Sequence, residues 1–358
     1  MKSRIAFLAV SQAHQFLHWL PAALRLGQEP DVEVTVLGST RAGLDFIRSY
    51  DPDGCLRLEP LWTPFFNSGG LFTPPRRRLV LMLNAWRIAR YPTIVTTETT
   101  SSLLRRVPGF RSRQILIKHG AGDREGSYNP KHASFDLILV NGRKHRDELI
   151  HRGLVRPDAC LVTGNAKLEL VRPAVPVFSD NKPLALYNPH FDRRLSSWFE
   201  HGRAIVRAMD HIRDWNFIIA PHVKLRDGPD VRSSAPNVII DPGSARSIDM
   251  TYTQAADVYI GDVSSQVYEF LVRPRPCVFL NLDRVDWRGQ ATYAHWNMGQ
   301  VIDSVDELEP ALRRAPQVQP EYEGVQRQML GYSMDAAEEP ASERQARAIL
   351  SFAHRQTG

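Results

Sequence analysis

The chain has 358 residues, of which 43% are hydrophobic and 23% are charged, as in a globular protein of two ordinary domains. Its net charge of +6 favours anionic partners such as a nucleotide, a phosphorylated substrate or an anionic lipid. The three cysteines lack disulfide or metal-ligand spacing, no run of 18 apolar residues occurs, and no nucleic-acid-binding motif is present. We therefore expect a cytoplasmic protein with no nucleic-acid partner.

Short apolar runs alternate with helical patterns along the whole chain. The predicted strands are 5–10, 32–37, 93–97, 115–118, 137–140 and 161–163, followed by 184–187, 217–220, 238–240, 258–260 and 277–280. The predicted helices include 15–26, 143–152, 197–211 and 245–256. Most strands are continuously apolar, which indicates burial on both faces. Alternation of strand and helix predicts parallel, doubly wound sheets of the α/β class.

Prolines frame a stretch without periodicity at 172–182, which is typical of a linker between domains. We predict Rossmann-like domains over 1–172 and 173–337, and a C-terminal helix within 338–358 that crosses back to the first domain. Two such sheets facing a cleft constitute the GT-B architecture.

The segment 62–78 mixes aromatic side chains with turn residues and the basic run 76–78. Aromatic and basic residues together are what a peripheral membrane contact requires, with Phe65, Phe66 and Phe72 available to insert. Alternatively, the aromatics fold back into the core and the arginines begin a solvated helix predicted over 77–90.

His119 stands at the C-terminal end of a predicted buried strand, where ligand sites of open α/β sheets lie. Histidine titrates near neutrality and is suited to general-base catalysis. Gly120 allows the backbone to approach a ligand, and Lys118, Asp123 and Arg124 add charge to the loop. The alternative is a histidine that is hydrogen-bonded inside a turn.

Other basic residues also follow predicted strands. Lys167 is placed to reach a phosphate, or is an ordinary solvated lysine in a first helical turn. His222 and Lys224 are candidates for binding a pyrophosphate. His14 and His18 follow the first strand and are either acceptor contacts or helix-surface residues.

In the segment 255–270, an apolar strand stops at Gly261 and Asp262, and Ser264 and Ser265 then begin a helix. Free N–H groups and serine hydroxyls at a helix start can bind phosphate without a glycine-rich loop. The alternative is a plain helix cap. The motif 51–53 is formally DxD but lies in a proline turn, so we predict no metal and no cofactor.

Taken in order, these pieces resemble the CDP-glycerol glycerophosphotransferase family, whose members make teichoic acids and related surface polymers. The resemblance extends from 115 to 349. It is carried by His119-Gly120, the run 164–167, Tyr187-Asn188-Pro189, His222, the block from Asp257 to Asp262-Val263-Ser264-Ser265, and the run 341–344. The block that ends in the two serines is the most specific of these.

The resemblance implies a GT-B enzyme with an acceptor-side first domain and a donor nucleotide-binding second domain, at the inner face of the cell membrane. It makes His119 and His222 catalytic, with His119 as the base that deprotonates the acceptor hydroxyl. From the resemblance and the residues together, we predict substrate-binding roles for Gly120, Asp123, Arg124, Lys167, Tyr187, Pro189, Lys224, Asp262, Ser264 and Ser265. The predicted reaction transfers glycerol phosphate or a similar alditol phosphate from a CDP-linked donor to a lipid-linked or glycan acceptor and releases CMP.

Several positions depart from the family pattern. Val223 follows the second histidine in place of proline, His190 and Asp192 replace the expected threonine and arginine, and Glu339-Pro340 replaces a glycine. These changes leave the transferred group open. Alternatives are a GT-B glycosyltransferase that uses a UDP- or CMP-sugar, a UDP-N-acetylhexosamine epimerase-like enzyme, and a non-catalytic nucleotide-binding module.

Overall fold

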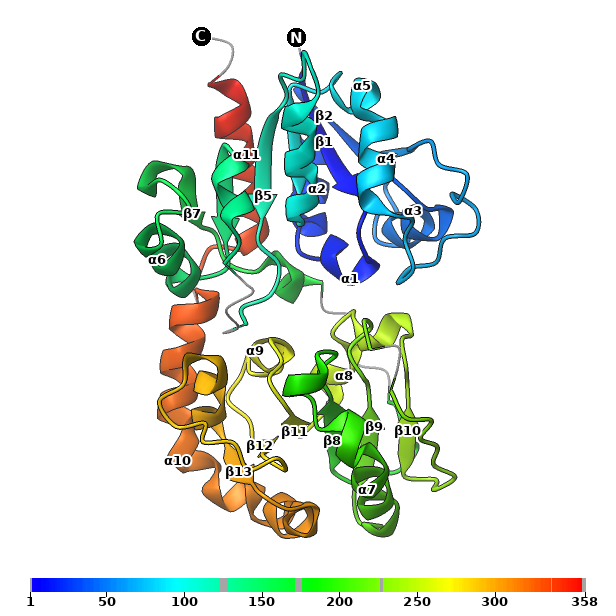
Figure 1. Ribbon diagram of the computed structural model, residues 1–358, viewed down its shortest axis with the longest axis vertical. Coiled ribbons are helices and arrows are strands. Elements are labelled where there is room, and N and C mark those ends of the chain that lie inside the picture. Colours follow the sequence, from blue (N-terminus) through cyan, green and yellow to red (C-terminus); the bar gives the residue numbers. More distant parts are fainter. Residues whose placement is uncertain (1, 123–127, 171–175, 226–227, 336, 356–358) are drawn as a thin grey trace. The chain divides into compact units, whose positions relative to one another are not determined.

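The chain folds into two units, each built on one parallel sheet, as the ribbon of the computed structural model shows (Figure 1). The structure describes residues 2–122, 128–170, 176–225, 228–335 and 337–355. Unit 1 comprises 1–120, 128–170 and 332–358, and unit 2 comprises 121–127 and 171–331.

The sheet of unit 1 has the strand order β3-β2-β1-β4-β5-β6-β7, and all its neighbouring strands pair in parallel. Its strands are β1 (Ser3–Ala9), β2 (Val32–Gly38), β3 (Arg57–Pro60), β4 (Thr93–Thr96), β5 (Arg113–Ile117), β6 (Leu137–Val140) and β7 (Cys160–Val162). Apart from the edge strands β3 and β7, these strands are largely buried, because helices cover both faces of the sheet.

The helices of unit 1 are α1 (Ala13–Phe16), α2 (Leu20–Gly27), α3 (Arg41–Arg48), α4 (Arg77–Leu83), α5 (Ala85–Ile88), α6 (Arg143–His151) and α11 (Ala341–His354). Short 3₁₀ helices lie at Thr99–Arg106, Pro130–Ser134, Pro157–Ala159 and Ala166–Glu169. α11 packs against α2, and the Arg25 guanidinium donates to Glu343 Oε1 at 2.6 Å. The C-terminal helix therefore belongs to the first unit.

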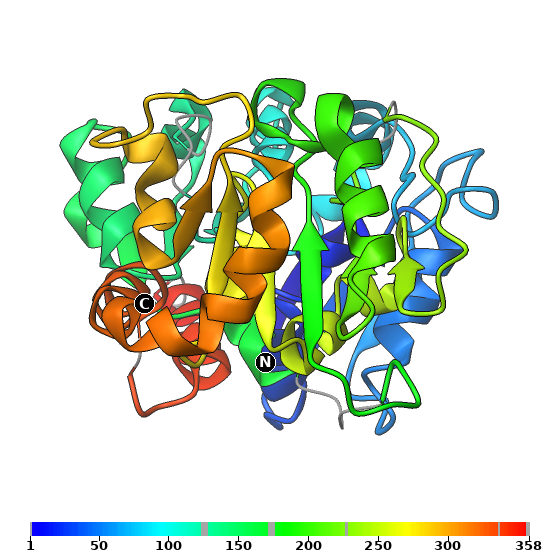
Figure 2. The same cartoon turned by 90° about the horizontal axis from the view of Figure 1, so that it is seen from below.

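The sheet of unit 2 has the order β10-β9-β8-β11-β12-β13 and is again parallel throughout. Its strands are β8 (Leu184–Asn188), β9 (Asn216–Ile219), β10 (Val238–Ile240), β11 (Val258–Gly261), β12 (Cys277–Leu280) and β13 (Gln300–Ile302). Its helices are α7 (Trp198–His211), α8 (Thr251–Ala255), α9 (Gln266–Phe270) and α10 (Leu308–Met334), with 3₁₀ helices at Arg193–Leu195, Ala245–Ser247, Ala291–Met298 and Val305–Glu307. α7 and the start of α10 pack on the same face of this sheet, where Ile205 and Leu312 share one core with Tyr187 and Ile260 (Figure 2).

The two doubly wound parallel sheets confirm the fold class predicted from the sequence. Three predicted helices are each split in two. The helix 77–90 breaks at Asn84, and the helix 245–256 breaks at Met250, whose φ of 72° is left-handed. The third, 15–26, divides ahead of Pro21, which lies in the first turn of α2. Within the described ranges, no helix is long and apolar enough to cross a bilayer.

Candidate active site

Each sheet has one point where the strand order reverses: between β1 and β4 in unit 1, and between β8 and β11 in unit 2. Ligands of open α/β sheets bind at the carboxyl ends of the strands beside such a switch point. Most of the predicted site residues that the structure describes follow the carboxyl ends of strands, and Tyr187 lies near the end of β8, so each unit offers one candidate subsite.

In unit 1, the loop after β5 places the His119 ring against the loop after β4. His119 Nδ1 lies 2.8 Å from the carbonyl oxygen of Thr97. A carbonyl oxygen only accepts hydrogen bonds, so Nδ1 carries the ring proton in the neutral histidine. Nε2 then holds the basic lone pair. Gly120 follows with a φ of 68°, a conformation that favours glycine and turns the chain away from the strand end.

Two further histidines lie near His119. Its ring centroid is 6.4 Å from that of His14 and 6.2 Å from that of His18. His18 is buried, and its Nδ1 lies 3.0 Å from Asn165 Oδ1. Burial lowers the pKa of His18 well below its usual value, and the positive charge of Lys167 and the neighbouring His119 lower it further. His18 is therefore neutral at pH 7 and adds a polar but uncharged group beside His119.

The loop 163–167 is supported by the start of α11. Gly164 has a φ of 78°, and a Cβ there would come within 2.5 Å of the Arg344 guanidinium. Gln345 Nε2 donates to the Gly164 carbonyl at 3.2 Å, and the Ser342 amide donates to Glu169 at 3.0 Å. Two sequence elements that lie far apart in the chain thus form one structural element.

Several buried polar atoms at this edge of the sheet lack a hydrogen-bond partner within the described part of the chain. They are Ser11 Oγ, Thr97 Oγ1, Thr163 Oγ1 and Asn165 Nδ2, which follow β1, β4 and β7. An unsatisfied buried polar group costs about 1–3 kcal/mol, which a hydrogen bond to a ligand or to ordered water recovers. This edge is therefore suited to a ligand that is rich in hydroxyl groups.

In unit 2, Asp262 joins the loops at the switch point. Its carboxylate accepts from Ser197 Oγ at 2.5 Å and from the His190 amide at 3.1 Å. Burial raises the pKa of Asp262 to about 6, although these hydrogen bonds oppose that shift. Its carbonyl oxygen lies 3.1 Å from His295 Nε2 and accepts from Trp296 Nε1 at 3.3 Å. Asp262 is thus an internal support of the site.

The loop after β9 orients His222. The His222 amide donates to the Pro189 carbonyl at 3.0 Å, and His222 Nδ1 accepts from the Lys224 amide at 3.1 Å. Because Nδ1 accepts, the ring proton of neutral His222 is on Nε2, which becomes a hydrogen-bond donor. His222 is half-buried, and its ring centroid lies 4.7 Å from that of Phe191.

The two serines differ in their surroundings. Ser264 is buried; its hydroxyl donates to Asn188 Oδ1 at 3.0 Å and accepts from the Gln266 amide at 3.3 Å. Ser264, the residue before the N-cap Ser265, therefore bonds the first amide of α9 and connects the helix start to the end of β8. Ser265 is half-buried and lies close to Gly122, because a Cβ added to Gly122 would be 3.2 Å from the Ser265 Cβ. Of the two serines, Ser265 is therefore the more exposed.

A sequence model of the CDP-glycerol:poly(glycerophosphate) glycerophosphotransferase family matches residues 140–351, more than half of the chain. The chain belongs to this family. The resemblance described above is thereby confirmed, and the chain is a glycerophosphotransferase-type enzyme. None of the proteins with curated descriptions matches it in sequence.

Solved structures share the fold of this glycerophosphotransferase. The wall teichoic acid polymerase TagF matches with a TM-score of 0.69 and 12% identity, over 99% of this chain and 90% of TagF. A variant of TagF soaked with CDPG gives a TM-score of 0.70 and 13% identity over 100% of this chain and 90% of that one. UDP-GlcNAc 2-epimerase from Neisseria meningitidis, bound to UDP-GlcNAc, matches with a TM-score of 0.65 and 14% identity, over 98% of this chain and 100% of the epimerase. The shared fold is GT-B.

The site residues predicted for this glycerophosphotransferase differ in their burial. Half-buried positions are His119, Gly120, His222, Lys224 and Ser265, whereas Lys167, Tyr187, Pro189, Asp262 and Ser264 are buried. Asp123 and Arg124 lie outside the described residues. The Tyr187 hydroxyl pairs with Ser197 Oγ at 2.6 Å, so this tyrosine supports the Asp262 network. Sequence reasoning did not assign Thr97, Asn188 or Ser197 to the site. Thr97 and Asn188 are polar residues at strand ends, whereas Ser197 directly precedes α7.

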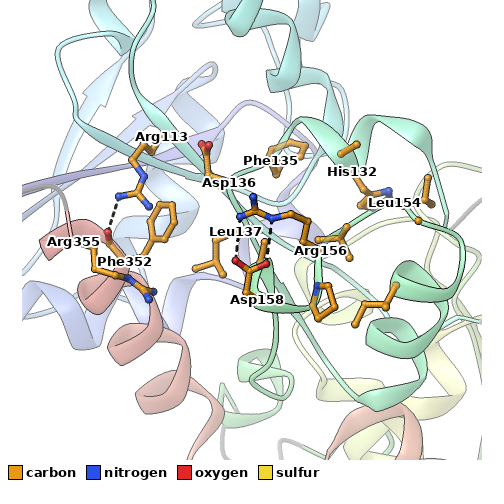
Figure 3. A pocket seen from close by; sticks show the side chains of 16 residues that line it. Arg113, His132, Phe135, Asp136, Leu137, Leu154, Arg156, Asp158, Phe352 and Arg355 are labelled. Atoms are coloured by element: carbon orange, nitrogen blue, oxygen red, sulfur yellow. Dashed lines mark hydrogen bonds and ion pairs between the residues drawn. The ribbon is translucent and has the colours of Figure 1, made fainter.

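Unit 1 also has a hollow of about 800 Å³ that lies apart from the predicted site residues (Figure 3). Its lining includes Arg113, Leu137 and Ala159 at the amino ends of β5, β6 and β7. Two of its arginines have partners: Arg113 donates to the Phe352 carbonyl at 3.1 Å, and Arg156 pairs with Asp158 at 3.1 Å. The family's motif residues are at the opposite edge of the sheet, so this hollow is not the candidate site. Within the described ranges, no three His, Cys, Asp or Glu side chains are grouped to hold a metal ion.

Proposed function

We propose that this enzyme transfers glycerol phosphate, or a similar alditol phosphate, from a CDP-linked donor to a hydroxyl group of a growing cell-surface polymer. The observation that carries the proposal is the pair of ring orientations: His119 presents a basic Nε2, and His222 presents an Nε2–H donor. Transfer of a phosphoryl-linked group to an alcohol needs one base for the hydroxyl and donors for the phosphates.

In the proposed step, His119 Nε2 takes the proton of the acceptor hydroxyl while the oxygen attacks the β-phosphorus of the donor. A new phosphorus–oxygen bond forms, and the bond from that phosphorus to the bridging oxygen breaks. CMP leaves with the bridging oxygen and its electron pair. The Thr97 carbonyl stabilises the imidazolium that forms, since it already accepts from Nδ1–H.

We assign the donor phosphates to unit 2. His222 Nε2–H and the Lys224 ammonium supply donors, and Ser265 adds a hydroxyl. Charge-assisted hydrogen bonds of this kind are roughly twice as strong as neutral ones. Asp262 and Ser264 position these loops through the contacts described above and do not themselves touch the donor.

We assign the acceptor to unit 1, where unsatisfied buried hydroxyl and amide groups surround the His119 loop. A polyol or glycan chain offers matching hydroxyl groups. The resemblance to a wall teichoic acid polymerase supports a polymer acceptor, which we propose to be lipid-linked or a glycan. Because the donor is a nucleotide, we place the reaction in the cytoplasm, at the inner face of the membrane where the acceptor is lipid-linked.

The test is incubation of the purified enzyme with CDP-glycerol, other CDP-alditols, UDP-sugars and CMP-sugars, each with a soluble acceptor analogue. CMP release from a CDP-alditol, together with glycerol phosphate on the acceptor, is the expected result. UDP release from a UDP-sugar, or epimerisation of UDP-N-acetylhexosamine, would contradict the proposal. The His119→Asn variant is the control for transfer that depends on the base.

A further inference from the structure

His18 lies close to the proposed base His119 but takes no part in the proton transfer described above. It stands in the turn between α1 and α2 and is 4% exposed, so it is not a helix-surface residue. Its ring centroid lies 6.2 Å from that of His119. A second histidine this close to the base is placed to contact the same substrate.

Asn165 fixes the tautomer of His18. The Asn165 Oδ1 accepts from the Lys167 amide at 3.2 Å, which identifies it as the oxygen of the side-chain amide. His18 Nδ1 lies 3.0 Å from the same oxygen. Because an amide oxygen only accepts hydrogen bonds, His18 Nδ1 carries the ring proton and Nε2 holds the lone pair.

His18 Nε2 is a hydrogen-bond acceptor and not a second base. Within the described residues, the ring forms one hydrogen bond, at Nδ1. Burial lowers the pKa of His18 well below its usual value, and the positive charge of Lys167 lowers it further. The ring therefore takes up no proton near neutral pH, although its lone pair still accepts a hydrogen bond from a hydroxyl group.

His18 and His119 thus present the same kind of atom. In each ring, an oxygen atom of the protein holds Nδ1–H: the Asn165 side chain for His18 and the Thr97 carbonyl for His119. Each Nε2 keeps its lone pair. Two lone pairs select groups that donate a hydrogen bond, such as hydroxyl groups, and disfavour phosphodiester oxygens, which carry no proton.

The loop that holds His18 also offers polar atoms to a hydroxyl group. Thr163 and Asn165 are each 3% exposed, and Thr163 Oγ1 and Asn165 Nδ2 lack a hydrogen-bond partner within the described part of the chain. An alcohol oxygen accepts hydrogen bonds while its own proton is donated to a ring nitrogen. A substrate with several hydroxyl groups therefore satisfies both kinds of protein atom.

We propose that His18 is a specificity-determining residue that binds a second hydroxyl group of the acceptor, adjacent to the hydroxyl that His119 activates. The acceptor end is then a vicinal diol, as in a glycerol or other polyol unit. The centroid separation of 6.2 Å is compatible with two neighbouring hydroxyl oxygens, each about 2.8 Å from its ring nitrogen. The inference rests on the proposed function for the role of His119, whereas binding of the diol does not require the transfer.

The experiment measures the binding of two acceptor analogues to the full chain without any nucleotide. Methyl glyceryl phosphate ends in two adjacent hydroxyl groups, and methyl 3-hydroxypropyl phosphate has the same charge but lacks the inner hydroxyl. NMR titration gives the dissociation constants, and the ¹⁵N signal of His18 Nε2 reports whether that nitrogen accepts a hydrogen bond.

Two variants separate the atoms of the ring. His18→Asn can still donate to Asn165 Oδ1 but has no acceptor at the position of Nε2, whereas His18→Gln can place an amide oxygen there. The matched control is Thr93→Val, which removes a buried hydroxyl without a partner in the described ranges, at the amino end of β4. Because both constants are measured on the same sample, an unfolded fraction cancels from their ratio.

We expect wild type and Thr93→Val to bind the diol about 5–100-fold more tightly than the mono-ol. Only the diol should shift the His18 Nε2 signal. His18→Asn should bind the two analogues within about threefold of each other, and His18→Gln should recover part of the preference.

Equal affinity of wild type for the two analogues, no binding of either, or a preference that survives in His18→Asn would overturn the inference. A failure of the proposed function gives a different result. In that case no CDP-alditol supports transfer, while the preference for the diol and its dependence on His18 are retained.

Discussion

The two units use histidine in opposite ways. In unit 1, His119 Nδ1 faces a backbone carbonyl 2.8 Å away, and in unit 2, His222 Nδ1 faces a backbone amide 3.1 Å away. The side chain is the same, each histidine follows a strand, and both are half-buried. The backbone group beside Nδ1 is a carbonyl in one case and an amide in the other.

This difference decides what each ring can do at Nε2. A carbonyl partner leaves Nε2 as a base, whereas an amide partner makes Nε2 a donor. A pattern of histidines at strand ends therefore indicates a site, but it does not show which ring is a base and which is a hydrogen-bond donor. The backbone of the neighbouring loop supplies that information, and substitutions that imitate one ring nitrogen at a time can test it.

The largest effect is expected for His119→Asn. The asparagine amide can still donate to the Thr97 carbonyl, so the loop is retained while the base is lost. We expect turnover to fall by about 10²–10⁴-fold with donor affinity nearly unchanged. Steady-state transfer assays and calorimetric titration with the donor measure both quantities. Turnover close to that of wild type would exclude the base role.

A smaller loss is expected at His222, and two substitutions sharpen the comparison. His222→Gln can keep a donor near the position of Nε2, whereas His222→Asn can keep only the acceptor for the Lys224 amide. Removing a donor to developing phosphate charge costs about 10²–10³-fold in turnover. We expect the asparagine variant to lose this much and the glutamine variant to lose less. The reverse order in the same assay would show that the loop contact, not the donor, matters.

Acid should destabilise unit 1, because it buries neutral histidines. Burial lowers the pKa of His132 to about 4, with a further contribution from the positive charge of Lys118. A histidine whose folded pKa is depressed stabilises the fold above its unfolded pKa of about 6.5, and this stability is lost as pH falls toward about 4. The loss from His132 amounts to as much as about 3 kcal/mol.

His132→Gln separates this effect from packing. Glutamine at this position can preserve the capping contact with the Asn129 amide but does not titrate. Urea unfolding at a series of pH values should show a weaker acid dependence for His132→Gln than for wild type. His151→Gln, at an exposed position on α6, is the control and should behave as wild type. Parallel pH profiles for all three proteins would argue against the assignment.

The smallest effects should distinguish the two serines. Ser264→Ala removes a buried hydrogen bond and the bond to the first amide of α9, so we expect it to lower the free energy of unfolding by about 1 kcal/mol. Ser265→Ala should leave stability unchanged and weaken donor binding. Thermal melts paired with calorimetric titration compare the two. If Ser264→Ala alone weakened the donor, the buried serine would have to be reassigned as a ligand contact.

The fold could be predicted from the sequence because buried parallel strands are continuous apolar runs. The strands that the sequence missed are β3 and β13, short edge strands whose residues are partly exposed and give no such run. Helix breaks were missed for a different reason. Asn84 ends α4 through its bonds to Trp62, a residue 22 positions away, which no local pattern reveals.

The site could be predicted from the sequence only in part. Strand-end positions identified His119 and His222. The sequence could not show that the Asp262 carboxylate and the Tyr187 hydroxyl are both hydrogen-bonded to Ser197. Such contacts depend on which loops the sheet order brings together. The directions of the hydrogen bonds at the two Nδ1 atoms likewise follow from loop geometry and have no signature in residue type.

The most direct test of this account is the protonation pattern of the two rings in the neutral enzyme. Two-bond ¹H–¹⁵N correlation spectra of imidazole-labelled protein distinguish a protonated from an unprotonated ring nitrogen, and spectra of His119→Gln and His222→Gln assign the signals. We predict that His119 carries its proton on Nδ1 and His222 carries its proton on Nε2. Two rings with the same tautomer, or the reversed pair, would contradict the assignment of one histidine as base and the other as donor.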